Sequence, residues 1–105
     1  MSLELIIRPV AEVEIAEAGD WYNRRRPGLG TEFVLAVNNT LAAVQQNPLQ
    51  YQIVWRQFRR AGVGRFPYGL IYGASDTEII VVSCFHSDAI QGCGGPEFDS
   101  WVRHQ

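Results

Sequence analysis

The chain has 105 residues, of which 47% are hydrophobic and 19% are charged, a composition typical of one globular domain that excludes an intrinsically disordered chain. All nine basic side chains are arginines and the net charge is −2, so general attraction to phosphate is weak and direct DNA binding is not expected. No apolar run approaches the length of a membrane span and the N-terminus lacks the pattern of a signal peptide, which predicts a cytoplasmic protein without membrane contact.

The first part of the chain predicts a short strand followed by an amphipathic helix. Residues 3–7 (LELII) are mostly apolar, and Pro9 after them suits the first turn of a helix. From residue 9 to 25 apolar side chains recur at helical spacing, with acids toward the start and arginines at the end. This charge order is the one that the helix macrodipole favours.

A second helix is predicted after the proline and glycines of residues 27–30, which end the first one. Its apolar stripe stops at Asn47 and Pro48 and is made by Phe33, Val37, Leu41 and Val44. Two amphipathic helices joined by so short a loop are typical of an αα-hairpin, which needs an apolar surface to cover.

The second half predicts three strands, at residues 53–61, 65–73 and 77–86. The last strand is apolar on both faces, which suits a central position covered from both sides. Pro67 indicates that the middle strand is paired on one side only near its start, or is bulged there.

The predicted fold is therefore an α+β domain spanning residues 1–105, with the order β-α-α-β-β-β. Its N-terminal helical hairpin would pack on a small, mainly antiparallel sheet. Residues 87–105 are interpreted as a variable tail, loop-like at first and ending in a helical turn anchored by Phe98 and Trp101.

Five short motifs, taken in order, resemble the ParE branch of the RelE/ParE toxins of bacterial toxin–antitoxin systems. They cover about residues 10–86 and read EIAEAGDWY, RPGLGTEF, NPLQY, FRRAGVGRFPYGLIY and IIVVSCFH. The chain departs from the ParE pattern in its tail, where Asp88 is acidic and a glycine-rich insert delays Trp101.

The resemblance implies a RelE/ParE-like fold, a cognate antitoxin whose flexible C-terminal segment wraps the toxin, and DNA gyrase as the target. It thus implies an inhibitor that acts by binding and needs no cofactor. For the RelE branch, the resemblance would instead imply a ribosome-dependent mRNA endonuclease.

A basic segment distinguishes this chain, because no acidic residue lies between Glu32 and Asp76 while four arginines do, namely Arg56, Arg59, Arg60 and Arg65. One interpretation is structural, with arginine stems covering apolar surface and the neighbouring aromatic side chains in the core. The other is a basic groove for an acidic, partly apolar antitoxin segment, since guanidinium groups bind carboxylates in a bidentate manner.

The same segment allows a catalytic alternative. In a ribonuclease, Arg59 and Arg65 could hold a phosphate while His86 acts as acid or base, because its ordinary pKa lies near neutrality. The sequence offers no lysine and no obvious second group for proton transfer.

The two cysteines are interpreted as reduced thiols. Cys84 lies in an apolar run, and Cys84, His86, Cys93 and His104 match no zinc-binding spacing. No metal and no cofactor are therefore expected.

The leading hypothesis is a ParE-like toxin that inhibits gyrase and contacts its partners through the four arginines of the basic segment, His86 and Trp101. A third hypothesis is a chain of the same fold that binds its antitoxin but has lost toxicity, as the altered tail suggests.

Overall fold

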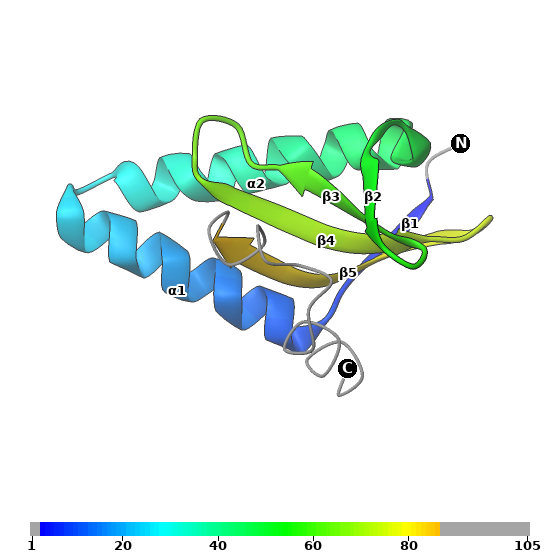
Figure 1. Cartoon of the computed structure of the whole chain (residues 1–105). Coiled ribbons are helices and arrows are strands. Elements are labelled where there is room, and N and C mark those ends of the chain that lie inside the picture. The colour runs from blue at the N-terminus through cyan, green and yellow to red at the C-terminus, as the bar shows by residue number, and fades with distance from the viewer. Residues whose placement is uncertain (1–2, 87–105) are drawn as a thin grey trace.

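A computed structural model describes residues 3–86 of the chain. Their elements are one strand, two long helices, a short 3₁₀ turn and four further strands (Figure 1). In chain order these are β1 (Glu4–Ile7), α1 (Pro9–Arg25), α2 (Leu29–Gln46), η1 (Pro48–Gln50), β2 (Gln52–Trp55), β3 (Phe58–Gly62), β4 (Tyr68–Ala74) and β5 (Glu78–His86).

The strands form one mixed sheet in the order β1-β5-β4-β3-β2. The last four strands follow one another as antiparallel hairpins, while β1 pairs in parallel with β5, with Ile6 opposite Ile80. The αα-hairpin leads from β1 at one edge of the sheet to β2 at the other, and β2 to β4 complete the long connection between the parallel strands β1 and β5. β5 thereby lies inside the sheet, between β1 and β4, as its apolar sequence suggested. The middle strand is β4, however, and within residues 3–86 the helices contribute to the core on one face of the sheet only.

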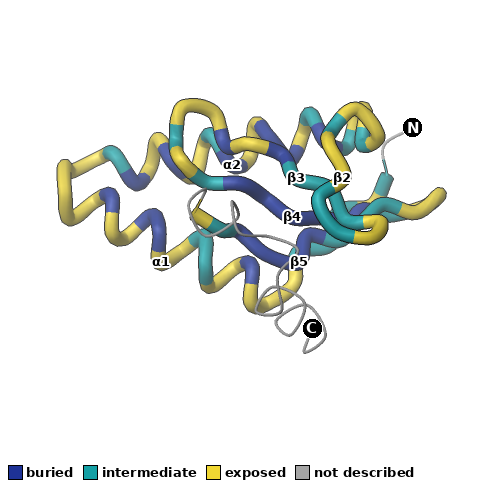
Figure 2. Tube along the Cα trace, in the orientation of Figure 1, coloured by how far each residue is buried: buried dark blue, intermediate teal, exposed yellow. Residues whose placement is uncertain are grey.

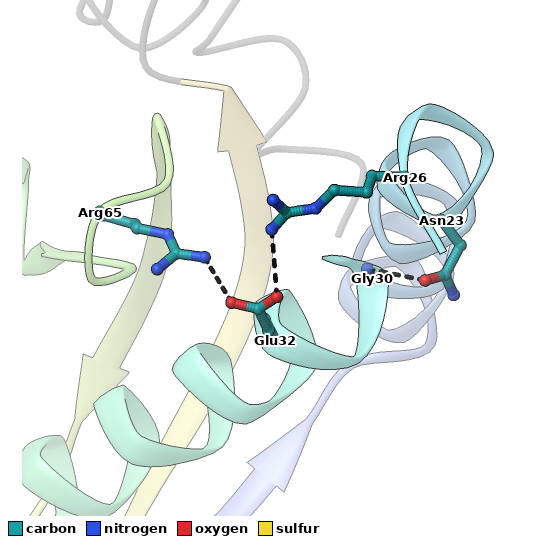
Figure 3. Close-up of polar contacts among 5 residues, drawn as sticks. All are labelled: Asn23, Arg26, Gly30, Glu32 and Arg65. Carbon is teal, nitrogen blue, oxygen red and sulfur yellow. Dashed lines mark hydrogen bonds and ion pairs between the residues drawn. The ribbon is translucent and has the colours of Figure 1, made fainter. Parts of the chain in front are cut away.

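The two helices pack closely where they are joined. Gly28, at φ 91°, ends the connection in the left-handed region, and α2 begins at the next residue. Oδ1 of Asn23 on α1 accepts a 2.8 Å hydrogen bond from the backbone N–H of Gly30 (Figure 3). The first helix therefore caps a donor at the start of the second that has no partner within its own helix.

The main core lies between the helical hairpin and one face of the sheet. Figure 2 shows buried positions on both helices and along β4 and β5. Four aromatic rings close one end of this core with centroids 5.0 to 6.1 Å apart: Tyr22, Phe33, Phe66 and Tyr68. Edge-to-face contacts of this kind add to the free energy gained by burial.

The opposite face of the sheet carries a second, smaller apolar cluster formed, within residues 3–86, by strand residues alone. Ile71 and Val82 are buried there, and partly buried side chains pack around them: Val54, Trp55, Phe58, Ile80 and Phe85. We call this surface the open face, since no described helix contributes to its cluster.

The expected α+β class and element order are confirmed, but the segment predicted as one strand at residues 53–61 is two strands. β2 and β3 are joined by a hairpin turn at Arg56 and Gln57, and Arg56 has φ 51°. Two-residue hairpin loops need a positive φ, which sequence usually signals with glycine or asparagine. Arginine gives no such signal, so this turn was not predicted.

Two other boundaries differ from expectation. β4 begins at Tyr68, directly after Pro67, so the proline precedes the ladder to which it could not donate. Residues 48–50 form a 3₁₀ turn after α2. Within residues 3–86, no helix combines the length and the apolar character needed to cross a bilayer.

Candidate partner-binding surface

The adjacent residues Arg59 and Arg60 lie on opposite faces of the sheet. Arg59 pairs across the ladder with Tyr72, which belongs to the main core, whereas Arg60 pairs with Ile71 on the open face. Because side chains alternate along a strand, the basic segment is divided between two surfaces.

Arg59 anchors the chain between α2 and β2. Its Nη1 donates hydrogen bonds to the carbonyl oxygens of Tyr51, at 2.7 Å, and Leu49, at 3.3 Å. Beside it, the hydroxyl of Tyr72 donates to the carbonyl oxygen of Pro48, and burial raises the pKa of that hydroxyl to about 12. Arg59 thus satisfies backbone acceptors of its own fold.

Arg65 lies in the loop between β3 and β4 and faces the helical hairpin. Its Nη2 is 2.5 Å from Oε1 of Glu32 on α2, and the other carboxylate oxygen accepts from Nη2 of Arg26 at 3.3 Å (Figure 3). All three side chains are largely exposed, so this network contributes little to stability.

Arg60 extends across the open face over β4. A methyl group on Gly69 would lie 2.5 Å from Nε of Arg60 and 3.1 Å from its Cγ, so the guanidinium and its stem lie flat against the backbone of β4. The side chain is half-buried and borders the apolar cluster around Ile71. An arginine laid over apolar surface in this way can pair with a carboxylate while its stem packs.

Arg56 extends the same surface at the hairpin tip. Its guanidinium carbon lies 4.6 Å from the ring centroid of Trp55, which stacks on Phe58 with centroids 5.9 Å apart. The open face therefore combines two arginines, stacked aromatic rings and aliphatic side chains. That mixture suits a partly apolar, acidic peptide segment.

His86 lies at the end of β5, with its ring centroid 5.2 Å from that of Tyr68. It is exposed and lies on the helix side of the sheet, as Tyr68 does. Arg59, Arg65 and His86, the three residues of the ribonuclease alternative, thus have separate partners: backbone carbonyls, Glu32 and Tyr68. Trp101 and the tail 87–105 lie outside the described residues.

Cys84 is a buried thiol on β5. Burial, with the nearby Glu14 carboxylate as a smaller cause, raises its pKa to about 12. Such a thiol carries almost no thiolate near neutrality and is a poor nucleophile or metal ligand. Residues 3–86 contain no group of three potential metal ligands, and Cys93 and His104 lie outside this part of the chain.

A groove between α1 and the ends of β4 and β5 was not predicted from the sequence. Glu14 projects into it from α1, where its Oε1 accepts hydrogen bonds from Oγ of Ser83 at 2.7 Å and from the backbone N–H of Cys84 at 3.0 Å. Burial raises the pKa of Glu14, and the Ser83 and Cys84 hydrogen bonds oppose that rise. An acidic residue on a helix face ordinarily indicates a solvated surface, so no sequence signal marked this position.

Comparison with solved structures finds several proteins with a similar fold. The chain is similar to a structure described as the chromosomal ParDE TA system from P. aeruginosa, with a TM-score of 0.72 and 16% identity over 81% of this chain and 96% of that chain. It is also similar to the E. coli DinJ–YafQ toxin–antitoxin complex, with a TM-score of 0.59 and 15% identity over 88% and 100%. A third match is the YoeB dimer from Staphylococcus aureus, with a TM-score of 0.54 and 16% identity over 80% and 95%.

No family model matches the sequence, and no curated protein matches it significantly. The structural matches are members of the RelE/ParE toxin superfamily. The fold of this chain is accordingly RelE/ParE-like, as its motifs indicated.

Proposed function

We propose that this protein is the toxin of a type II toxin–antitoxin system, acting in the manner of ParE. The observation that carries the proposal is the likeness to the P. aeruginosa ParDE structure over 96% of that chain at a TM-score of 0.72. The five ordered motifs support it independently, since they depend on the order of residues along the chain and on no coordinates.

The proposed partner is an antitoxin that places an acidic, partly apolar segment on the open face. Two of the solved relatives, ParDE and DinJ–YafQ, are described as toxin–antitoxin systems or complexes. On this chain Arg60 and Arg56 are proposed to pair with carboxylates, while side chains around Phe58 receive apolar anchors. Contacts with the partner stay predictions for four further residues: Arg59, Arg65, His86 and Trp101.

DNA gyrase is the proposed target, inhibited by binding and without bond cleavage. Two features support this choice over mRNA cleavage. The TM-score is higher for ParDE than for the YoeB and YafQ structures. In addition, Arg59 and Arg65, the proposed phosphate ligands of a nuclease, are engaged within the chain itself.

The proposal is tested by inducing the chain in bacteria and measuring growth, plasmid supercoiling and mRNA integrity in the same cultures. Growth arrest with loss of supercoiling supports gyrase inhibition. Arrest with cleaved mRNA and normal supercoiling would contradict it in favour of ribosome-dependent cleavage. Unimpaired growth, together with tight binding of the protein encoded beside it, would indicate an antitoxin-binding protein without toxicity.

The open face is tested by a charge reversal. Arg60→Glu is expected to weaken antitoxin binding by about tenfold or more, because the reversal leaves a partner carboxylate facing a like charge. Arg8→Glu makes the same change in charge at the start of α1 and serves as the matched control. Equal affinity of the Arg60→Glu variant and the parent in calorimetric titration would remove the open face from the binding site.

A further inference from the structure

The groove between α1 and the β4–β5 end of the sheet is a large hollow in the described part of the chain, with a volume of about 990 Å³. Its lining includes side chains from α1, namely Glu14, Glu17, Asp20 and Trp21, and from the two strands, namely Tyr68 and His86. The volume is in the range of sites that receive a ligand or a large side chain.

Aromatic rings form much of the groove. Trp21 meets Tyr22 edge to face at 5.0 Å between centroids, Tyr22 meets Tyr68 at 6.1 Å, and Tyr68 meets His86 at 5.2 Å. The faces of the tryptophan and tyrosine rings carry partial negative charge and attract cations. The chain itself provides an example, because the guanidinium carbon of Arg25 lies 4.4 Å from the ring centroid of Trp21.

Carboxylates line the α1 side of the groove. Glu14, Glu17 and Asp20 recur at intervals of three residues, so they lie along one side of the helix. Ser83 and Cys84 bind the same oxygen of Glu14 and thereby fix its position. Among the described residues, Arg24 lines the groove and Arg25 lies against its Trp21 ring. Three acids against these two arginines leave the described lining with an excess of negative charge.

We infer that this groove binds an arginine side chain presented by a peptide segment of a partner protein. A guanidinium can stack on the rings while its N–H groups reach the carboxylates, a combination that the compact ammonium of lysine matches less well. Anionic ligands such as phosphate or an acidic peptide would meet the three carboxylates, so the charge selects against them.

Among the described residues, this site shares only Phe85 with the open face, and the inference does not depend on the proposed function. The open face offers arginines to an acidic segment, whereas the groove offers acids and rings to a basic side chain. One partner that uses both surfaces would need acidic and basic residues on separate parts of its chain.

The inference is tested by titrating the isotope-labelled full chain with the capped peptide Gly-Gly-Arg-Gly-Gly and following backbone amides and the Trp21 indole by NMR. The control peptide carries citrulline, which keeps the shape of arginine without its charge. The arginine peptide is expected to shift resonances of Glu14 to Tyr22, Tyr68 and His86, with an affinity about tenfold higher than that of the citrulline peptide.

Variants locate the site. The double variant Glu17→Gln, Asp20→Asn is expected to weaken binding of the arginine peptide about fivefold or more, since it removes two carboxylates but keeps their size. Glu12→Gln, an exposed change on the same helix outside the groove, is expected to bind as the parent does. The spectra themselves report whether each variant is folded.

Three results would overturn the inference: equal binding of the arginine and citrulline peptides, parental affinity of the double variant, or shifts confined to the open face. The peptide titration involves no toxicity or antitoxin, so a failure of the proposed function leaves its outcome unchanged.

Discussion

Replacing Gly30 with alanine should destabilise the protein, whereas the same replacement at Gly19, on the facing helix, should not. A methyl group on Gly30 would lie 2.2 Å from the backbone carbonyl oxygen of Gly19 and 2.5 Å from Cγ of Asn23. Backbone cannot move aside as a flexible side chain can, so the two helices must separate. At Gly19 the nearest atom would be Cγ2 of Val34 at 3.6 Å, an ordinary contact.

The magnitudes follow from these distances. For Gly30→Ala, overpacking costs about 1–3 kcal/mol and loss of the Asn23 hydrogen bond about 1 kcal/mol, offset in part by better helix propensity. We expect a net loss of about 2 kcal/mol in the free energy of unfolding, or a Tm lower by about 8–16 °C. For Gly19→Ala the propensity term acts alone, so stability should be unchanged or higher by up to about 1 kcal/mol.

Urea unfolding followed by far-UV circular dichroism measures both variants against the parent. The difference between the two alanine variants is the decisive quantity, because both substitutions change the unfolded chain in the same way. The close approach of the helices at Gly30 is refuted if the free energy of unfolding of Gly30→Ala is within about 0.5 kcal/mol of that of the parent. It is also refuted if Gly19→Ala lowers the free energy of unfolding by as much as Gly30→Ala does.

Three further predictions concern buried or anchoring groups. Burial raises the pKa of Glu14 above its usual 4.5, so the stability that its protonated form contributes is present below pH 4.5 and is lost as the pH rises through the raised pKa. In thermal melts, the Glu14→Gln variant should therefore gain stability relative to the parent between pH 4 and pH 7. A stability difference that stays constant over this range would contradict the prediction. The pKa of Cys84 is about 12 instead of 9.0. In a Cys93→Ser variant, Cys84 should therefore react with a thiol reagent about a thousandfold more slowly than an exposed thiol. Rapid labelling of the folded protein would show instead that the Cys84 thiol is accessible. Arg59→Ala should lower the free energy of unfolding by about 2 kcal/mol, because two carbonyl oxygens lose a charged donor. This loss should exceed that of Arg65→Ala, which removes an exposed ion pair and a contact of the guanidinium with the Phe66 ring.

Local sequence predicted the helices and strands wherever the spacing of apolar side chains and the position of helix- or strand-terminating residues agreed. The apolar stripe of α2 runs from Phe33 to Val44 at helical spacing, and the Asn47–Pro48 boundary follows it, so both the helix and its C-terminal end could be predicted. β5 is apolar on both faces and proved to be an interior strand, between β1 and β4. The turn at Arg56 was not readable, because its backbone conformation is imposed by pairing of the strands on either side.

The candidate site was less predictable than the fold. Arg59 and Arg60 are adjacent in sequence and identical in chemistry, but one binds carbonyl oxygens at the edge of the main core and the other lies over Gly69 on the open face. Alternation along a strand predicts that they face apart, but which face the helices cover depends on contacts between segments far apart in the chain. The groove beside Glu14 has the same origin, since its partner Ser83 is 69 residues away.

The sequence by itself determined the order of helices and strands, the helical hairpin, the interior position of β5 and the likeness to RelE/ParE toxins, because these depend on spacing, composition and motif order along the chain. The tertiary structure alone decided which arginines stabilise the fold, which lie on the open face, and that acids and rings converge in a groove. These depend on how distant segments pack, and packing determines which charged groups bind backbone or acidic groups of the fold and which lie on a surface of the sheet.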